Sequence, residues 1–215
     1  MTHIKSLKLE RVGQIVSANV EFGDLTILVG PQATGKSIFL QFLKLVLDTG
    51  YVHDQLSRHG IDWKREAGEF LELYLGEGMS GVWREREPSS EIIVNGKTRD
   101  IVRMATLHHR SKRATAFYIP AQRVLSLSKG WPRSFQDFAT GDPFAVRDFS
   151  ETFRLLLDRE FNRSEDLFPG ARRLKSEYRA QLSRHVFGGF GLHVDSHVLQ
   201  KRLVLRQRAE GKAIP

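Results

Sequence analysis

Apolar and polar residues alternate over Ile4–Leu9 and again over Ile15–Phe22, and this period of two predicts two strands. The following run, Leu25–Val29, is apolar over the length of a buried strand. Apolar residues then dominate Ser37–Asp48, where the long polar side chains recur every three or four positions and form one narrow helical stripe. We therefore expect two amphipathic strands, a buried strand, and a buried helix that ends at Gly50.

The middle of the chain is expected to add an antiparallel β layer. Glu91–Lys97 is a strand pattern that enters an Asn-Gly turn, which is a strong signal of a hairpin. Two shorter runs, Glu69–Leu75 and Gly81–Trp83, also have the composition of strands. The segment Asp100–Arg113 that follows them predicts a helix.

The last third of the chain predicts a helical lobe and two return strands. The apolar positions of Val146–Phe161 follow one helical face, and Ala171–Val186 has the pattern of a basic helix. Gly191–Val194 and Val198–Leu205 then have strand patterns. The expected domains are a core over residues 1–133, a helical lobe over 134–189 and return strands over 190–215.

Composition and charge narrow the class of protein. The 215 residues include no cysteine, which removes disulfides and thiolate metal sites and suits a reducing compartment. No secretory signal and no apolar run of about 18 residues is found, so a cytoplasmic protein without membrane contact is expected. The net charge is +8, and residues 171–215 carry ten Lys or Arg against three acids. The basic segment 171–208 indicates a nucleic-acid or acidic partner, or simply a solvated helix face.

The run Gly30–Ser37 reads G-x-x-x-x-G-K-S between the expected strand and helix, which is the pattern of a phosphate-binding loop. Its glycines allow successive backbone N–H groups to face an anion, and the helix N-terminus adds further donors. Lys36 is expected to reach the β- and γ-phosphates and Ser37 to bind Mg²⁺, so the expected ligands are ATP and Mg²⁺. The residues expected to hold the nucleotide are Gly30, Pro31, Gln32, Ala33, Thr34, Gly35, Lys36 and Ser37.

The letters I-K-S-L-K-L-E at Ile4–Glu10 and F-G-D-L-T-I-L-V-G-P-Q-A-T-G-K-S at Phe22–Ser37 resemble a family's N-terminus. That family is the ABC-type ATPases of the chromosome-maintenance, RecF and overcoming-lysogenization-defect group. Gln32 and Thr34 stand where the family usually has Asn and Ser or Gly. The resemblance implies an α/β fold, with a P-loop NTPase core, an antiparallel β layer and a small helical lobe. It also implies that Arg11 lies near the phosphates; an exposed turn arginine is the alternative.

A second resemblance lies at Tyr118–Arg123, where Y-I-P-A-Q-R is similar to the Y-I-P-A-E-R strings of the lysogenization-defect relatives. These letters end an expected apolar strand, Ala116–Pro120. In the family such a strand leads to a glutamine that approaches Mg²⁺ and the attacking water. The resemblance therefore implies that Gln122 is a catalytic and metal-binding residue beside Lys36; a polar turn that caps the strand is the alternative.

An acid at the end of an apolar strand, which hydrolysis requires, is not evident in the chain. The best candidate, Leu192–Asp195, is short and interrupted by a histidine. Leu127–Trp131 matches the L-S-x-G-x signature of ABC-type proteins, but no strand that ends in Asp-Glu follows it, so we interpret it as a chance match. We expect the signature and the second acid to lie beyond residue 215.

The expected function is ATP hydrolysis by a homo-oligomer, in which two copies sandwich the nucleotide. The resemblance implies DNA repair, chromosome handling or anti-phage defence, with an effector protein as a further partner. One alternative is a sensor or assembly platform that binds ATP without turnover. The other is a P-loop kinase for a small molecule, against which the two strands before the loop argue.

Overall fold

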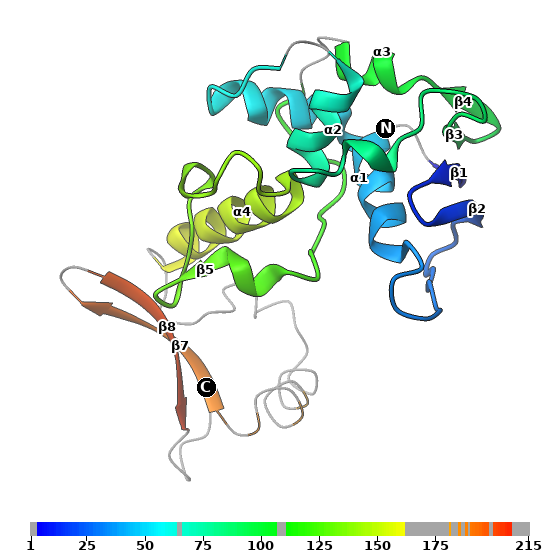
Figure 1. Ribbon diagram of the computed structural model, residues 1–215. Helices are drawn as coiled ribbons and strands as arrows, with labels where there is room; N and C mark the ends of the chain where they lie inside the picture. Colours follow the sequence, from blue (N-terminus) through cyan, green and yellow to red (C-terminus); the bar gives the residue numbers. More distant parts are fainter. Residues whose placement is uncertain are drawn as a thin grey trace. The chain divides into compact units, whose positions relative to one another are not determined.

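The structure is a computed structural model that describes residues 4–63, 66–106, 111–161, 181, 185, 188, 190–197 and 200–207 (Figure 1). The chain forms two compact units. The first contains Met1–Arg123 and Phe135–Phe149, and the second contains Val124–Ser134 and Ser150–Pro215. The described part is a mixed α/β protein with an antiparallel sheet, in agreement with the coarser part of the expected fold class.

The first unit contains a four-stranded antiparallel sheet with the order β2-β1-β3-β4. Its strands are β1 (Ser6–Val12), β2 (Ile15–Glu21), β3 (Glu91–Val94) and β4 (Lys97–Arg99). The Asn-Gly turn between β3 and β4 has positive φ at Asn95 (49°) and Gly96 (75°), which matches the twist of a tight hairpin. The two N-terminal strands and the β3–β4 hairpin are therefore confirmed.

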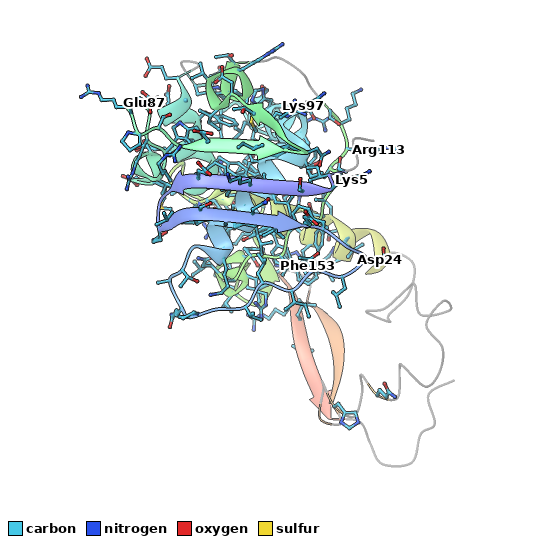
Figure 2. All side chains as sticks on the ribbon, turned by 90° about the vertical axis from the view of Figure 1, so that its right-hand side faces the viewer. Lys5, Asp24, Glu87, Lys97, Arg113 and Phe153 are labelled. Carbon is cyan, nitrogen blue, oxygen red and sulfur yellow. The ribbon has the colours of Figure 1, made fainter. Side chains whose placement is uncertain are left out.

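Helices α1 (Lys36–Arg58) and α2 (Ala67–Leu75) belong to the same unit. Figure 2 shows the sheet face-on, with helices behind it. Leu7 and Leu9 of β1 and Phe42 and Leu45 of α1 are fully buried in one hydrophobic core. Successive residues of a strand point to opposite faces of the sheet. Lys8 and Glu10 of β1 therefore lie on the face away from this core, where they form an ion pair. The unit is thus built on an amphipathic sheet packed against apolar helices.

Several sequence predictions are wrong in this unit. Glu69–Leu75 forms most of helix α2 instead of a strand, because Phe70, Leu71 and Tyr74 recur at helical spacing and are all buried. Gly81–Trp83 overlaps a short 3-10 helix (Ser80–Val82) and adds one isolated bridge between Val12 and Trp83. Helix α1 also continues past Gly50 to Arg58, and its helical geometry is interrupted only at Asp48 (φ −126°, ψ 23°).

The remaining elements include α3 (Ile101–Thr106) and α4 (Phe144–Phe161). Helix α4 confirms the helix expected there, whereas α3 confirms only the first part of the expected helix Asp100–Arg113, because residues 111–113 are not helical. In the second unit, β7 (Phe190–His197) pairs with β8 (Gln200–Gln207), which confirms the two return strands. Leu127–Trp131 forms a small hairpin between β5 (Leu127–Ser128) and β6 (Trp131–Pro132). Two 3-10 helices, Arg123–Ser126 and Phe135–Asp137, flank that hairpin. The expected basic helix Ala171–Val186 lies almost entirely outside the described residues.

Two expected strands, Leu25–Val29 and Ala116–Pro120, are not strands in the structure. Within the described ranges, neither segment has a hydrogen-bonded strand beside it. Their apolar side chains are left at the surface: Leu25 is 80% exposed, Ile27 71%, Val29 86%, Phe117 64% and Ile119 59%. An apolar run makes a strand only when a neighbouring strand accepts its backbone hydrogen bonds, and the described residues offer no such neighbour here.

Candidate functional site

The predicted phosphate-binding loop leads directly into helix α1. Gly30 (φ 152°), Ala33 (φ 62°) and Gly35 (φ 87°) all have positive φ, which reverses the chain within a few residues. Gly35 is the N-cap of α1, and its carbonyl accepts the first helical hydrogen bond from the Phe39 N–H at 2.8 Å. No side chain caps this helix end, so its first N–H groups remain available to a ligand. The expected turn from loop to helix is therefore confirmed.

Lys36 and Ser37 occupy the first turn of α1, as the loop pattern requires. The Lys36 ammonium donates to the Gly30 carbonyl at 2.9 Å, to the Pro31 carbonyl, and to Thr34 Oγ1 at 3.1 Å. The Thr34 hydroxyl in turn donates to the Pro31 carbonyl at 3.0 Å. These contacts hold the ammonium over the loop, and Ser37 is exposed beside it.

A cavity of about 290 Å³ lies at this loop and the start of α1. Seven of its eight lining residues belong to the loop and helix: Gln32, Ala33, Thr34, Gly35, Lys36, Ser37 and Ile38. The eighth is Gln14, from the turn between β1 and β2, which belongs to no motif of the sequence. A single exposed glutamine in a turn carries no sequence signal; only the approach of the turn to the loop reveals it.

Arg11, expected near the phosphates, points to other partners in the structure. Its guanidinium donates to the Ser89 carbonyl at 2.6 Å, to Glu10 at 3.0 Å and to Glu91 at 2.7 Å. It does not line the loop cavity. The hydrogen bond from Lys8 lowers the pKa of the neighbouring Glu10, and the Arg11 charge acts in the same direction. Arg11 thus serves the β1–β3 pairing here, and a contact with phosphate stays a prediction.

Gln122 is exposed in the turn before the 3-10 helix Arg123–Ser126. It is not among the residues that line the loop cavity, so the structure does not bring it together with Lys36 and Ser37. Its role as a catalytic or metal-binding residue stays a prediction.

The segment before Gln122 is fixed at its start by a buried ion pair on α1. Lys44 and Asp48 meet at 2.7 Å, and their side chains are 3% and 1% exposed. The Asp48 carboxylate accepts the backbone N–H groups of Thr115 at 2.6 Å and Ala116 at 3.0 Å, and Lys44 donates to the Ala116 carbonyl at 2.7 Å. This clamp, formed by Lys44 and Asp48, gives each buried charge several hydrogen bonds.

Asp148 of α4 completes the surroundings of the clamp. Its carboxylate lies 3.8 Å from the Lys44 ammonium and accepts a hydrogen bond from the Tyr51 hydroxyl at 2.8 Å. Burial raises the pKa of Asp148, although Lys44 and Tyr51 oppose the shift. Burial thus makes the charged form of this carboxyl group less favourable than it is in an exposed aspartate.

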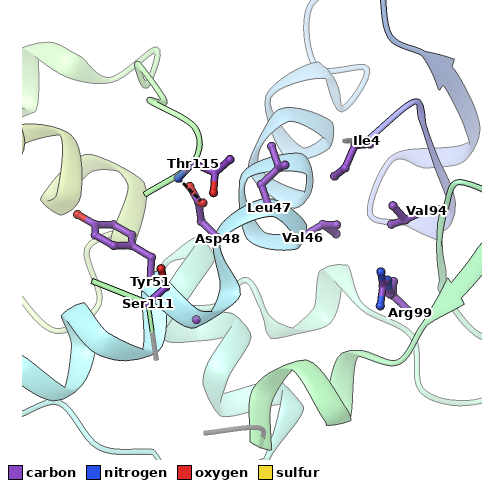
Figure 3. Close-up of a pocket in the computed structure, with 10 residues that line it drawn as sticks. Ile4, Val46, Leu47, Asp48, Tyr51, Val94, Arg99, Ser111 and Thr115 are labelled. Carbon is purple, nitrogen blue, oxygen red and sulfur yellow. Dashed lines mark hydrogen bonds between the residues drawn. The ribbon is translucent and has the colours of Figure 1, made fainter. Parts of the chain in front are cut away.

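A second cavity, of about 230 Å³, borders the clamp. Figure 3 shows Asp48 with its hydrogen bond to Thr115, and Arg99 and Val94 across the cavity from Tyr51. Polar and apolar side chains both line it, and the Asp48 carboxylate already accepts two backbone hydrogen bonds. We assign no ligand to it.

No family model, no curated protein and no solved structure matches the chain. Among the described residues, no group of three or more His, Cys, Asp or Glu side chains is placed to hold a metal ion. No helix in the described ranges combines the length and the apolar character needed to cross a membrane. The function is therefore inferred from the loop itself.

Proposed function

We propose that the chain binds a nucleoside triphosphate with Mg²⁺ at Gly30–Ser37, and that it acts as part of an ABC-type ATPase. The observation that carries the proposal is the geometry of the loop. Three positive φ values turn the chain into an uncapped helix N-terminus, with the Lys36 ammonium held over the turn. Backbone N–H groups, the helix dipole and one lysine are together suited to a polyphosphate.

Lys36, Ser37 and the backbone N–H groups at the start of α1 would have separate roles in this proposal. Lys36 would exchange its bonds to the Gly30 and Pro31 carbonyls for the β- and γ-phosphate oxygens, which carry more negative charge. Ser37 would supply a hydroxyl to Mg²⁺, and the N–H groups at the start of α1 would bind phosphate oxygens. Mg²⁺ would neutralise charge on the β- and γ-phosphates.

The proposal includes a site completed by further polypeptide, in an ATP-sandwich dimer with a second copy. Leu25–Val29 runs directly into the loop, and Ala116–Pro120 runs directly into Ala121 and Gln122. Both segments expose apolar side chains without a strand partner in the described residues, and additional strands would cover them. Such strands would also provide a place for the acid and the signature that hydrolysis by this class of enzyme requires.

The first prediction tests binding through the Lys36 ammonium. Lys36→Ala removes a charge-assisted contact, so we expect the affinity for Mg-ATP to fall about 10- to 100-fold. Isothermal titration calorimetry of the chain with Mg-ATP measures this effect. Lys97→Ala, which changes an exposed lysine on β4, is the matched control and should leave the affinity unchanged. Equal affinities of the wild type and Lys36→Ala would refute the proposal.

A sensor or assembly platform that binds ATP without hydrolysis is the second candidate. The observation in its favour is that none of the residues lining the loop cavity is an Asp or Glu. Phosphate release from Mg-ATP distinguishes the two candidates. Tight binding without release above the Lys36→Ala background would support the platform, and release that depends on Lys36 would support the ATPase. The processes implied by the resemblance, DNA repair and anti-phage defence, stay predictions.

A further inference from the structure

The turn between β1 and β2 lies against the loop and α1. An added Cβ at Gly35 would lie only 2.6 Å from Ile15 Cγ1, so the Ile15 side chain packs directly against the backbone of Gly35. An added Cβ at Gly13 would lie 3.5 Å from Ile38 Cδ1 and 3.2 Å from Val82 Cγ1. The residues on both sides of Gln14 are therefore packed against the residues on both sides of Lys36 and Ser37.

The β1–β2 turn is also held in place by Val82 and Trp83. The Gly13 N–H donates to the Val82 carbonyl at 2.8 Å, and Val12 forms a bridge with Trp83. Val12 and Ile15, which face each other across the turn, are both buried. Gln14 itself is exposed, and no hydrogen bond links its carboxamide to another described residue. A fixed backbone thus carries a free amide at the wall of the loop cavity.

The position of Gln14 along a bound triphosphate follows from the two ends of the loop. The Lys36 ammonium lies at Gly30 and Pro31, which marks the end for the β- and γ-phosphates. The neighbours of Gln14 pack instead against Gly35 and Ile38, at the helix end of the loop. A triphosphate that places its γ end at Gly30 places its α end, and the nucleoside beyond it, toward the helix end.

We infer that Gln14 contacts the nucleoside part of the bound triphosphate, an inference that rests on the proposed nucleotide site. A carboxamide has no charge with which to bind phosphate strongly, but it offers two N–H donors and one carbonyl acceptor. These groups match the hydroxyl groups of ribose and the polar edge of a base; glutamine pairs with adenine through both groups elsewhere. Gln14 thus lets the site distinguish a nucleotide from an inorganic polyphosphate.

The test compares two ligands that share the phosphates and differ in the nucleoside: Mg-ATP and Mg-tripolyphosphate. Wild-type protein should bind ATP more tightly than tripolyphosphate. Gln14→Ala should weaken ATP binding about 3- to 10-fold, the effect of one or two hydrogen bonds, and leave tripolyphosphate binding unchanged. Asn19→Ala removes another exposed amide, on β2, and should change neither affinity. Calorimetry with 2′-deoxy-ATP and GTP then shows whether the sugar or the base supplies the contact.

The outcomes separate this inference from the proposed function. A loss that is equal for both ligands would place Gln14 on the phosphates and overturn the inference, as would unchanged affinity for ATP. Wild-type protein that binds ATP and tripolyphosphate equally would overturn it as well. Failure of the wild type to bind either ligand would instead refute the proposed nucleotide site, and the inference with it.

Discussion

Gly35 is the residue at which the loop and the β1–β2 turn meet. It has a φ of 87°, which side chains other than hydrogen rarely permit, and Ile15 fills the space that a Cβ would need. The positive φ by itself is a reason for glycine at this position of the loop. In this protein the close approach of Ile15 adds a second reason, because it joins the sheet to the candidate site.

The prediction at this position concerns stability and binding together. Gly35→Ala should lower the free energy of unfolding by about 1–3 kcal/mol, through backbone strain and the contact with Ile15, and should weaken Mg-ATP binding. Urea unfolding and calorimetry measure the two effects. Gly23→Ala is the control, because its Cβ would meet only the Leu25 carbonyl, at 3.9 Å. A Gly35→Ala variant as stable as Gly23→Ala would contradict the explanation.

Residue identity alone is a poor guide to the partner of a charged side chain. The resemblance implies that Arg11 lies near phosphates, yet it binds Glu10, Glu91 and Ser89, which are far from it in sequence apart from Glu10. The turn from the loop into α1 is predictable because the loop pattern fixes a local backbone, whereas the partners of an arginine depend on which strands become neighbours. The place of Gln14 at the loop cavity escapes prediction for the same reason.

At the scale of elements, the clamp of Lys44 and Asp48 joins α1 to the segment that leads to Gln122. It lies where α1 loses helical geometry, at Asp48, and it holds both the N–H groups and a carbonyl of residues 115 and 116. Asp148 of α4 forms an ion pair with the same lysine, Lys44. Three elements distant in sequence are thus linked through one lysine, and removal of a single partner would leave a buried charge uncompensated.

The pH dependence of stability tests this cluster through Asp148. Burial raises its pKa in the folded state, so the folded protein holds the proton more tightly than the unfolded chain does. The contribution of Asp148 to stability is therefore full below its ordinary pKa of about 4 and is lost as pH rises through the raised folded value. As pH rises above about 4, the free energy of unfolding of the wild-type protein should therefore fall relative to that of Asp148→Asn.

Urea unfolding of both proteins between about pH 4 and about pH 7 measures the difference. Asp62→Asn, which removes an exposed carboxylate, shows the effect of losing one negative charge without burial. A stability difference between wild type and Asp148→Asn that stays constant with pH would contradict the raised pKa of Asp148.

Strands are predictable where their partners are also nearby in the chain. The alternation in β1 and β2, and the Asn-Gly turn after β3, each specify a hairpin from local residues. Glu69–Leu75 is ambiguous because a short apolar run fits a strand or a buried helix equally well. Leu25–Val29 has a strand's composition, but pairing is a property of two segments, and no described segment pairs with it.

At the scale of the whole molecule, positive charge is concentrated toward the C-terminus. If the basic segment 171–208 follows a nucleic-acid backbone, the logarithm of the affinity for duplex DNA should fall linearly with the logarithm of salt concentration. Reversal of charge at Arg172 and Arg173, to Glu, should reduce the slope by about 2. Fluorescence anisotropy with a labelled duplex measures the slope. Binding that is independent of salt would exclude this partner.

The exposed run Leu25–Val29 also has a consequence for how the protein behaves during synthesis and storage. It is five residues long, uncharged and rich in β-branched side chains, which is the composition of segments that nucleate cross-β aggregation. Asp24 and the Gly30-Pro31 pair flank it immediately, and charged residues and prolines are the gatekeepers that natural sequences place beside such runs. Pro31 of the candidate phosphate site thus also acts against the stacking of the exposed apolar segment that precedes it.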